Sequence, residues 1–452
     1  MSAPDVRSLI SALGRRDFLR AAAAVTAGGG LAACTGLAAA PPALATTGTP
    51  VPGGPLQPGQ GDITGDHYLD STPDAVRWGY VPAIGAEPVL TVRSGQTVTI
   101  DTVSHEGILE DQGRDPVAWF GERGVAADGV LSDAVAIARD YRRTPRDFDT
   151  DGPHVITGPI FVEGARPGDV LKIETLAAVP RVPYGVVSSR HGKGALARTR
   201  DGGPPAGITL DEVMPPVATD GRALGDPVRQ GNVSIFTSVR PGKDGALHGV
   251  MPFGDGNEVS FPLRPFMGTM GVAHLPGGAE NAPELNSIPP TLGGGNIDIR
   301  LLGEDSAFYL PVRSEGALFY VGDPHLAMGD GEVALTALEG SLRATFRLTV
   351  CRPGEGTAPS VAFGYPFGET PDAWLPIGLS DPDGVVDGQG TDLNVAMRRA
   401  VVNALDFLEA DKGMDRATGY AYLSAAADFA VSQVVDRTVG VHGVIPKAHF
   451  HG

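Results

Sequence analysis

The stretch Gly322-Asp323-Pro324-His325-Leu326-Ala327-Met328-Gly329-Asp330-Gly331-Glu332 is the most informative part of this chain. It contains three acids, one histidine and three glycines, and it lies between the apolar runs 317–321 and 333–338. Charges at this density are costly to bury unless they pair, shift their pKa or bind a cation. Glycines allow tight turns and the close approach of a ligand to the backbone. A solvated hairpin loop is the alternative interpretation, because Gly and Asp are common turn residues.

Several other segments accompany this stretch in a fixed order. They are 157–165 (Thr-Gly-Pro-Ile-Phe-Val-Glu-Gly-Ala), 167–169 (Pro-Gly-Asp), 265–268 (Pro-Phe-Met-Gly) with Gly271, 294–298 (Gly-Gly-Asn-Ile-Asp), 309–312 (Tyr-Leu-Pro-Val) and 433–436 (Gln-Val-Val-Asp). The series resembles the acetamidase/formamidase family of amide hydrolases over roughly residues 80–447. The resemblance implies the family's fold, an amide substrate and a homodimer.

The composition indicates an acidic globular protein. The formal net charge is −18, and residues 1–45 hold four arginines and two aspartates, so the remainder carries about −20. Such a surface disfavours nucleic acid and anionic membranes as partners. The 63 glycines and 39 prolines predict many turns and therefore a β-rich architecture.

Residues 1–45 are interpreted as a targeting segment, followed by a flexible linker over 46–75. Arg15 and Arg16, with the mildly apolar run after them, resemble a twin-arginine signal, which predicts a periplasmic or extracytoplasmic protein. Two processing routes stay open. Lipidation at Cys34 would attach the protein to a membrane, whereas cleavage after Ala45 would release it.

The rest of the chain, 76–452, is predicted to be one acetamidase/formamidase-like domain of the β-rich α+β class. Its body is expected to contain mostly antiparallel strands with two C-terminal helices packed against it. A charged insertion over about 106–153 contains one helical candidate at 131–142. The segments 89–92 and 97–100 predict a hairpin around Gly95.

The period of the apolar residues changes towards the C-terminus. Residues 342–350 alternate apolar and polar side chains, which predicts a strand with one wet face. From 393 to 408 the spacing is helical, with Asp392 as N-cap and Gly413 beyond the C-terminus. A second helix is predicted over 417–435, with Met397 and Tyr420 as core residues of this helical region. Cys351 follows the strand and is interpreted as a buried core residue.

Amide hydrolysis requires a nucleophile, stabilisation of the oxyanion and a proton for the leaving amine. The sequence has no Gly-x-Ser-x-Gly motif, and Cys351 has no base near it in the sequence. It does concentrate histidines and carboxylates in the family-like motifs, which favours a metal- or carboxylate-assisted route.

Three clusters supply the candidate residues. The first is His325 with Asp323, Asp330 and Glu332; the second is Asn296 with Asp298, whose side chains share one face of an extended segment. The third is Asp101 with His105 and Glu106. Many family members carry His where this chain has Gly293, and His105 could substitute for it.

From the resemblance first and residue chemistry second, we expect Asp101, His105, Asp298 and His325 to bind a divalent cation, zinc or calcium. Glu332, Asp330 and Asn296 are the expected catalytic residues. The predicted reaction converts short linear amides, such as formamide or acetamide, into ammonia and a carboxylate. The alternatives are an exported binding protein without turnover and a hydrolase of larger or cyclic amides, with the insertion reshaping access to the pocket.

Overall fold

The computed structural model describes residues 54–199, 202–217, 231–277, 285–382 and 391–450. These residues lie in one compact unit, Thr46–Gly452. The predictions for the signal segment 1–45, including Arg15, Arg16, Cys34 and Ala45, and for residues 46–53 lie outside the described residues. Within the described ranges, no helix is both long enough and apolar enough to cross a membrane.

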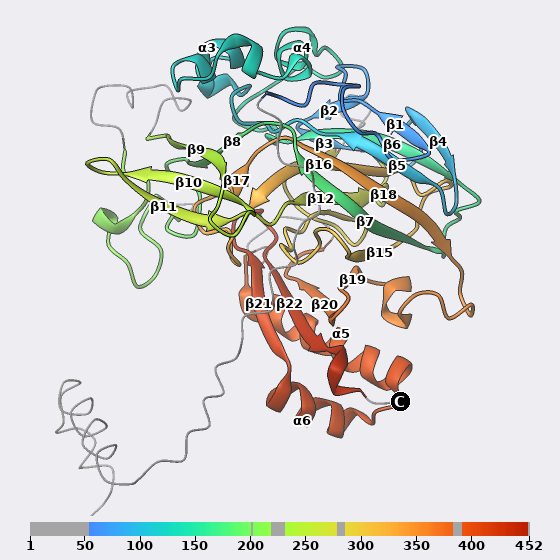
Figure 1. Cartoon of the computed structure of the whole chain (residues 1–452). Helices are drawn as coiled ribbons and strands as arrows, with labels where there is room; N and C mark the ends of the chain where they lie inside the picture. The colour runs from blue at the N-terminus through green and yellow to red at the C-terminus, as the bar shows by residue number, and fades with distance from the viewer. Residues whose placement is uncertain (1–53, 200–201, 218–230, 278–284, 383–390, 451–452) are drawn as a thin grey trace, which may run out of the picture. The chain divides into compact units, whose positions relative to one another are not determined.

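Two large sheets form the body of this unit (Figure 1). The first contains, in spatial order, β1 (His67–Leu69), β5 (Thr97–Asp101), β18 (Leu342–Cys351), β7 (Val170–Pro180), β15 (Ala307–Pro311), β19 (Phe367–Glu369), β20 (Ala373–Leu379), β22 (Gly440–Pro446) and β21 (Asp428–Gln433). The second contains β11 (Asn257–Pro262), β10 (Leu247–Phe253), β9 (Val233–Pro241), β8 (Tyr184–Ser189), β17 (Leu338–Glu339), β16 (Phe319–Ala327), β12 (Phe266–Val272) and β14 (Gly294–Asn296).

Three further strands extend the second sheet. β6 (Val155–Glu163) pairs with β16, and β2 (Val76–Trp78) and β4 (Leu90–Arg93) pair with β6. A separate two-stranded sheet joins β3 (Tyr80–Val81) to β13 (Leu285–Asn286). Among the described strand pairs, only β1–β5 and β4–β6 are parallel, as expected for a mostly antiparallel body.

A shared apolar core holds the two sheets together. Phe319 on β16 and Phe346 on β18 meet edge to face, with ring centroids 5.7 Å apart, and both side chains are fully buried. Ile100, Leu310 and Val321 belong to the same cluster. Burial of aliphatic and aromatic side chains on this scale is the main force that stabilises a domain of this size.

The predicted first C-terminal helix is confirmed as α5 (Leu393–Lys412). The Asp392 side chain accepts a hydrogen bond from the Asn394 backbone N–H at 2.8 Å, and Gly413 ends the helix in the left-handed conformation. The helix packs against β20 so closely that a Cβ on Gly378 would overlap the helix backbone at Ala396 and Ala400.

The second C-terminal helix, α6 (Arg416–Ala426), is shorter than the predicted 417–435. Residues 428–433 instead form β21, which pairs with β22, because sheet pairing outweighs the local helical spacing of the apolar residues. Met397 and Tyr420 are exposed rather than core residues, with exposed fractions of 40% and 63%.

The segment 106–153 forms a helical layer that shares an apolar cluster with strands of the body. It contains α3 (Pro116–Gly121) and α4 (Ser132–Asp140), the latter confirming the helix predicted at 131–142. Trp119, Phe120 and Ile137 are buried there against Trp78 and Tyr184. Short 3₁₀ turns are η2 (Glu110–Gln112), η3 (Ala127–Gly129), η4 (Leu210–Glu212), η6 (Ser360–Phe363) and η7 (Lys447–His449).

The predicted hairpin at 89–100 is wrong, although both of its strands exist. β4 pairs with β6 in the second sheet, whereas β5 pairs with β1 and β18 in the first. The turn at Gly95, whose N–H donates to the Leu348 carbonyl at 2.7 Å, therefore connects the two sheets. Long-range pairing decided this arrangement, and adjacency in the sequence did not.

Part of the predicted linker is also ordered strand. Residues 67–69 form β1, parallel to β5, and Leu69 is buried. The Tyr68 hydroxyl donates to Asp101 Oδ2 at 2.7 Å, which ties this segment to the body.

The polar face of β18 is not wet over its first half, since Arg343 and Thr345 are buried. Arg343 binds Asp101 through both ends of its guanidinium, with Nε–Oδ1 at 2.6 Å and Nη2–Oδ2 at 2.8 Å. Arg181 Nη2 approaches the same carboxylate at 3.5 Å. Asp101 therefore belongs to a buried ion-pair network that joins β5 to β18.

We predict that Asp101→Ala lowers the free energy of unfolding by about 3–5 kcal/mol, because it leaves the buried guanidinium group of Arg343 without its carboxylate and leaves Arg181 with Asp133 alone. Urea denaturation measures the change. Arg347→Ala on the same strand, where the side chain is exposed, serves as the control and should change stability by no more than about 0.5 kcal/mol. Equal losses in both variants would show that the network contributes nothing specific.

Candidate functional site

A cavity of about 320 Å³ opens between the insertion and the strands that carry the family-like motifs. Its lining includes His105, His154, Asn296, Asp323, Glu332, Glu339 and Asp436 together with Arg146, Phe148, Arg190, Lys193 and Arg437. The acids and histidines come from four regions of the chain, around residues 105, 154, 323–339 and 436. Only the tertiary fold brings them together.

The central pair of site residues, Asp323 and His325, lies on β16. The strand continues through Asp323 and His325, so the turn predicted in this stretch begins only after Ala327. Both side chains are buried, with His325 Nε2 lying 3.2 Å from Asp323 Oδ2. Gly268 on neighbouring β12 makes room for them, because a Cβ there would overlap Asp298, His325 and Asp323.

Three acids of the site have backbone conformations that are rare for residues with a side chain. Asp298, Asp323 and Glu332 have φ values of 54°, 55° and 46°. Such conformations cost free energy and persist where the surrounding structure imposes them, and they concentrate at functional sites. Three acids of one cluster share this rare conformation, which indicates that the surrounding structure fixes the direction of their carboxylates.

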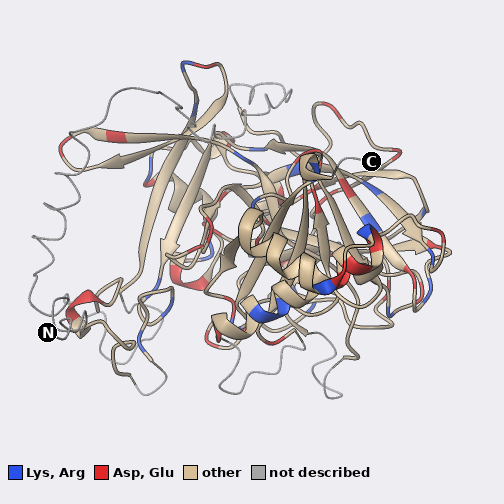
Figure 2. Cartoon of the chain, turned by 90° about the horizontal axis from the view of Figure 1, so that it is seen from below, with Lys and Arg blue, Asp and Glu red and all other residues tan. Residues whose placement is uncertain are grey.

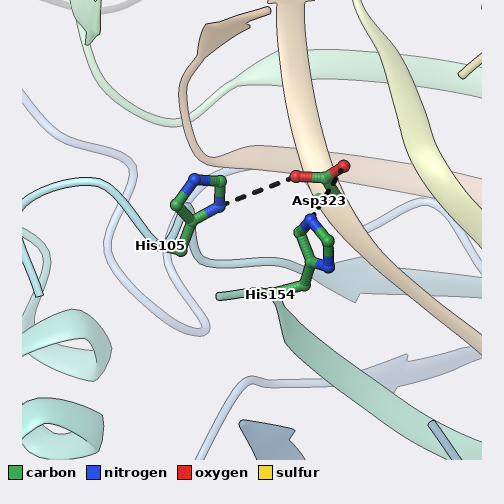
Figure 3. Close-up of side chains that lie close together, drawn as sticks. All are labelled: His105, His154 and Asp323. Carbon is green, nitrogen blue, oxygen red and sulfur yellow. Dashed lines mark ion pairs between the residues drawn. The ribbon is translucent and has the colours of Figure 1, made fainter. Parts of the chain in front are cut away.

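His105 and His154 flank Asp323 (Figure 3). His105 Nδ1 lies 3.6 Å from Asp323 Oδ1, and His154 Nε2 lies 3.7 Å from Asp323 Oδ2. These distances are too long for hydrogen bonds. The other ring nitrogen of His154 is 2.9 Å from Ser287 Oγ, which orients Nε2 towards the carboxylate.

Carboxylates surround His325 on its other sides. Nε2 is 3.1 Å from Glu339 Oε1 and 3.8 Å from Glu332 Oε1, and Nδ1 is 3.9 Å from Asp298 Oδ1. Asp298, Glu332 and Asp436 form a further group of three acids, each with an oxygen within 4.8 Å of the others. The Gly331 N–H donates to the Ser432 carbonyl at 3.0 Å and so holds the turn before Glu332 beside the 433–436 segment.

The electrostatics of the cluster follow from burial and crowding. Burial raises the pKa of Asp298, Glu332 and Asp436, and a neighbouring carboxylate in each case raises it further. Burial opposes ionisation of Asp323, but the histidines around it, His154 first and then His325, hold its pKa below the usual range. Burial lowers the pKa of His154 to about 4.

Many polar atoms of the site have no hydrogen-bond partner among the described residues. They include both ring nitrogens of His105 and His325, both carboxylate oxygens of Asp298, and one oxygen each of Asp323, Glu339 and Asp436. Unpaired buried polar atoms are costly, which indicates that this cluster is completed by something outside the protein chain. Imidazole nitrogens with carboxylate oxygens suit a divalent cation.

The structure brings together five of the seven site residues predicted from the sequence. His105, His325 and Asp298 lie in the cluster, Glu332 lies beside them, and Asn296 lines the cavity. Thr269 Oγ1 donates to Asn296 Oδ1 at 2.7 Å and fixes its side chain.

Asp101 and Asp330 are the two predicted site residues that lie outside the cluster. Asp101 is occupied by Arg343 in the ion-pair network between β5 and β18, away from the cavity lining. Asp330 sits on the exposed side of its turn, where both of its oxygens accept hydrogen bonds from Arg300 at 2.8 Å. The side chain of Glu332, two residues further on, is turned inward instead.

Three residues of the cluster were not expected as site residues from the sequence: His154, Glu339 and Asp436. Asp436 ends the Gln-Val-Val-Asp motif, so its place in a matched motif was a usable signal. His154 stands immediately before β6, at the end of the charged insertion. Glu339 lies on a strand of two residues, and no local pattern marks it.

Comparison with known proteins shows what the chain resembles in sequence and in fold. Residues 278–451 match the Acetamidase/Formamidase family, which confirms the resemblance inferred from the motifs. The chain is 27% identical over 301 residues to a formamidase of Methylophilus methylotrophus, an alignment that covers 60% of this chain and 70% of the relative. It is 28% identical over 225 residues to an acetamidase of Mycolicibacterium smegmatis, covering 43% of this chain and 52% of the relative.

A crystal structure of an acetamidase from Bacillus halodurans shares the fold. The TM-score is 0.56 at 22% identity, with 85% of this chain and 98% of that chain covered. This likeness confirms the predicted β-rich α+β class with its two C-terminal helices. In sequence, the chain spans about half the length of the acetamidase from Mycolicibacterium smegmatis.

We predict that Gly268→Ala damages the site directly, because its new methyl group overlaps Asp298, Asp323 and His325. The free energy of unfolding should fall by about 1–3 kcal/mol, the usual cost of overpacking a buried site. Guanidinium denaturation measures the loss. Gly121→Ala, at a position where a Cβ meets nothing within 4 Å, is the matched control and should be as stable as the parent protein. A stable Gly268→Ala variant would mean that the cluster is not tightly packed.

Proposed function

We propose that this protein hydrolyses the carbon–nitrogen bond of short linear amides and releases ammonia and a carboxylate. The observation that carries the proposal is the buried cluster of histidines and acids on the floor of a cavity, with its polar atoms left unpaired. The relatives named formamidase and acetamidase point to the same substrates.

A divalent cation, zinc or calcium, is part of the proposal. His105, His154 and Asp323 supply two imidazoles and a carboxylate, a set that suits zinc, whereas Asp298, Glu332 and Asp436 supply only oxygens, which suit calcium. The unpaired atoms of both sets fit the binding of a cation. When bound, such an ion lowers the pKa of water and polarises a carbonyl group.

The protein's own residues provide the rest of the chemistry. Since Thr269 holds the carbonyl oxygen of Asn296, the amide nitrogen of Asn296 is left to donate to a substrate carbonyl. Burial and the charge of Asp298 raise the pKa of Glu332, which favours the protonated form of this side chain when no cation is bound to it. A carboxylic acid of this kind can protonate the leaving amine.

The first test is ammonia release from formamide, acetamide and propionamide. We expect Glu332→Gln and Asp298→Asn to lower kcat by about 100-fold or more, the usual contribution of an acid–base group or a well-placed charge. Asp330→Asn is the matched control: it lies in the same turn but pairs with Arg300 on the surface, and it should retain activity. Binding of amides without ammonia release would instead support a capture protein.

The second test is the pH dependence of cation binding. Protons and a cation compete for carboxylates whose pKa is raised, so the affinity should weaken as the pH falls through the raised pKa values of Asp298, Glu332 and Asp436. Chelator-treated protein titrated with Zn²⁺ or Ca²⁺ in a calorimeter gives the affinity at each pH. At a cation concentration of 100 Kd, the folded state should gain about 2.7 kcal/mol. Full activity after complete metal removal would show a mechanism that uses carboxylates alone.

A further inference from the structure

Four cationic side chains line the cavity above the acidic floor. They are Arg146, Arg190, Lys193 and Arg437. The chain as a whole carries a net charge of −18, and its acidic residues are spread over many elements (Figure 2). A gathering of cations in one cavity of so acidic a protein needs a local explanation.

Two of the four cations are neutralised by acids of the insertion. Arg146 donates to both oxygens of Glu110 at 3.1 and 3.2 Å, and Arg190 Nε donates to Asp111 Oδ2 at 2.8 Å. Arg190 also lies 3.7 Å from Glu106. The ion pairs with these acids explain why Arg146 and Arg190 lie in the cavity.

The other two cations have no such partner. Among the described residues, neither the Lys193 nor the Arg437 side chain forms an ion pair or a hydrogen bond. Both are exposed and so are free to meet a ligand. Desolvation, and after it the charges of Arg190 and Arg437, lower the pKa of Lys193, while the charges of Asp111 and Asp149 act in the opposite direction.

The backbone holds both residues at the cavity. The Lys193 N–H donates to the Arg190 carbonyl at 3.0 Å, and the Ala195 N–H donates to the Val333 carbonyl at 2.9 Å. On the other side, Gln433 is fully buried, and its Oε1 accepts from the N–H groups of Val435 and Asp436 at 2.9 and 3.2 Å.

The loop braced by Gln433 carries groups of opposite charge at neighbouring positions. Asp436 belongs to the acidic floor, and Arg437 comes directly after it with a φ of 61°. Asp436, at the floor, and Arg437, which can bind a charged ligand group, are therefore adjacent in the chain.

The size of the cavity indicates a substrate larger than formamide. A volume of about 320 Å³ falls at the lower end of the range for sites that hold multi-atom ligands. A molecule that spans from the floor to Lys193 and Arg437 has one end at the histidines and acids and the other end at two unpaired cations.

We propose that the cavity takes a primary amide that also carries a carboxylate, with the amide at the floor and the carboxylate bound by Lys193 and Arg437. This inference rests on the proposed amide hydrolysis and names its substrate class, the monoamides of dicarboxylic acids. Charge-assisted hydrogen bonds from lysine and arginine to a carboxylate are the strong kind, and they select against neutral amides of the same length.

The test compares amides matched in length but not in charge: succinamate against butanamide, and glutaramate against pentanamide. We expect kcat/KM to favour the anionic member of each pair by about tenfold, the contribution of one or two charged hydrogen bonds. The preference should shrink as the salt concentration rises, because exposed charges are screened.

Variants locate the effect. In Lys193→Gln combined with Arg437→Gln, the preference for succinamate over butanamide should disappear. Lys243→Gln, a charge removed from the turn between β9 and β10 and outside the cavity lining, is the matched control and should keep the preference. Equal kcat/KM for both members of each pair in the parent protein would overturn the proposal, as would a preference that survives in the double variant.

Binding measurements keep this inference separate from the proposed reaction. If no amide is hydrolysed, calorimetry with succinamate still tests the carboxylate site in the parent protein and in the double variant. Binding that the double variant loses would support the site although the reaction proposal had failed. An absence of succinamate binding to the parent protein would overturn the site itself.

Discussion

Asp323 and His325, neighbours on one face of β16, place a carboxylate and an imidazole 3.2 Å apart inside the protein. Charged groups in such a position need partners, because desolvation is far more costly than any single contact is favourable. The fold provides such partners only in part. Histidines surround Asp323, but further carboxylates lie beside them. This excess of unpaired acid is the constraint on which the chemistry of the cavity depends.

The surrounding structure holds that cluster in place, and the backbone conformations that this requires cost free energy. Three of its acids adopt backbone conformations that favour glycine, and Gly268 leaves the space that their side chains occupy. A second buried network, Asp101 with Arg343, joins strands of the first sheet outside the cavity. The protein thus contains two kinds of buried charge: one neutralised by arginine and structural, the other incomplete and available for ligands.

The cavity is lined by side chains of both charges. Its cluster of histidines and acids suits a cation, and Arg146, Arg190, Lys193 and Arg437 line the same cavity. The segment 106–153 supplies Arg146 and the acids that neutralise Arg190, so it shapes the cationic part of the lining.

The sequence alone determined the resemblance to the acetamidase/formamidase family, the β-rich class, and helix α5 with its cap at Asp392, because these depend on local pattern and on ordered motifs. It also named five residues that the structure brings together at the cavity. It could not distinguish Asp101 and Asp330 from the acids of the cluster, since an aspartate in a motif looks the same whether or not an arginine pairs with it. The tertiary structure alone decided that β4 and β5 enter different sheets and that His154, Glu339 and Asp436 join the site. The physical reason is that pairing between strands and burial of charge arise from contacts between segments that are separated in the sequence, in the case of β5 and β18 by more than 200 residues, and no local pattern records such contacts.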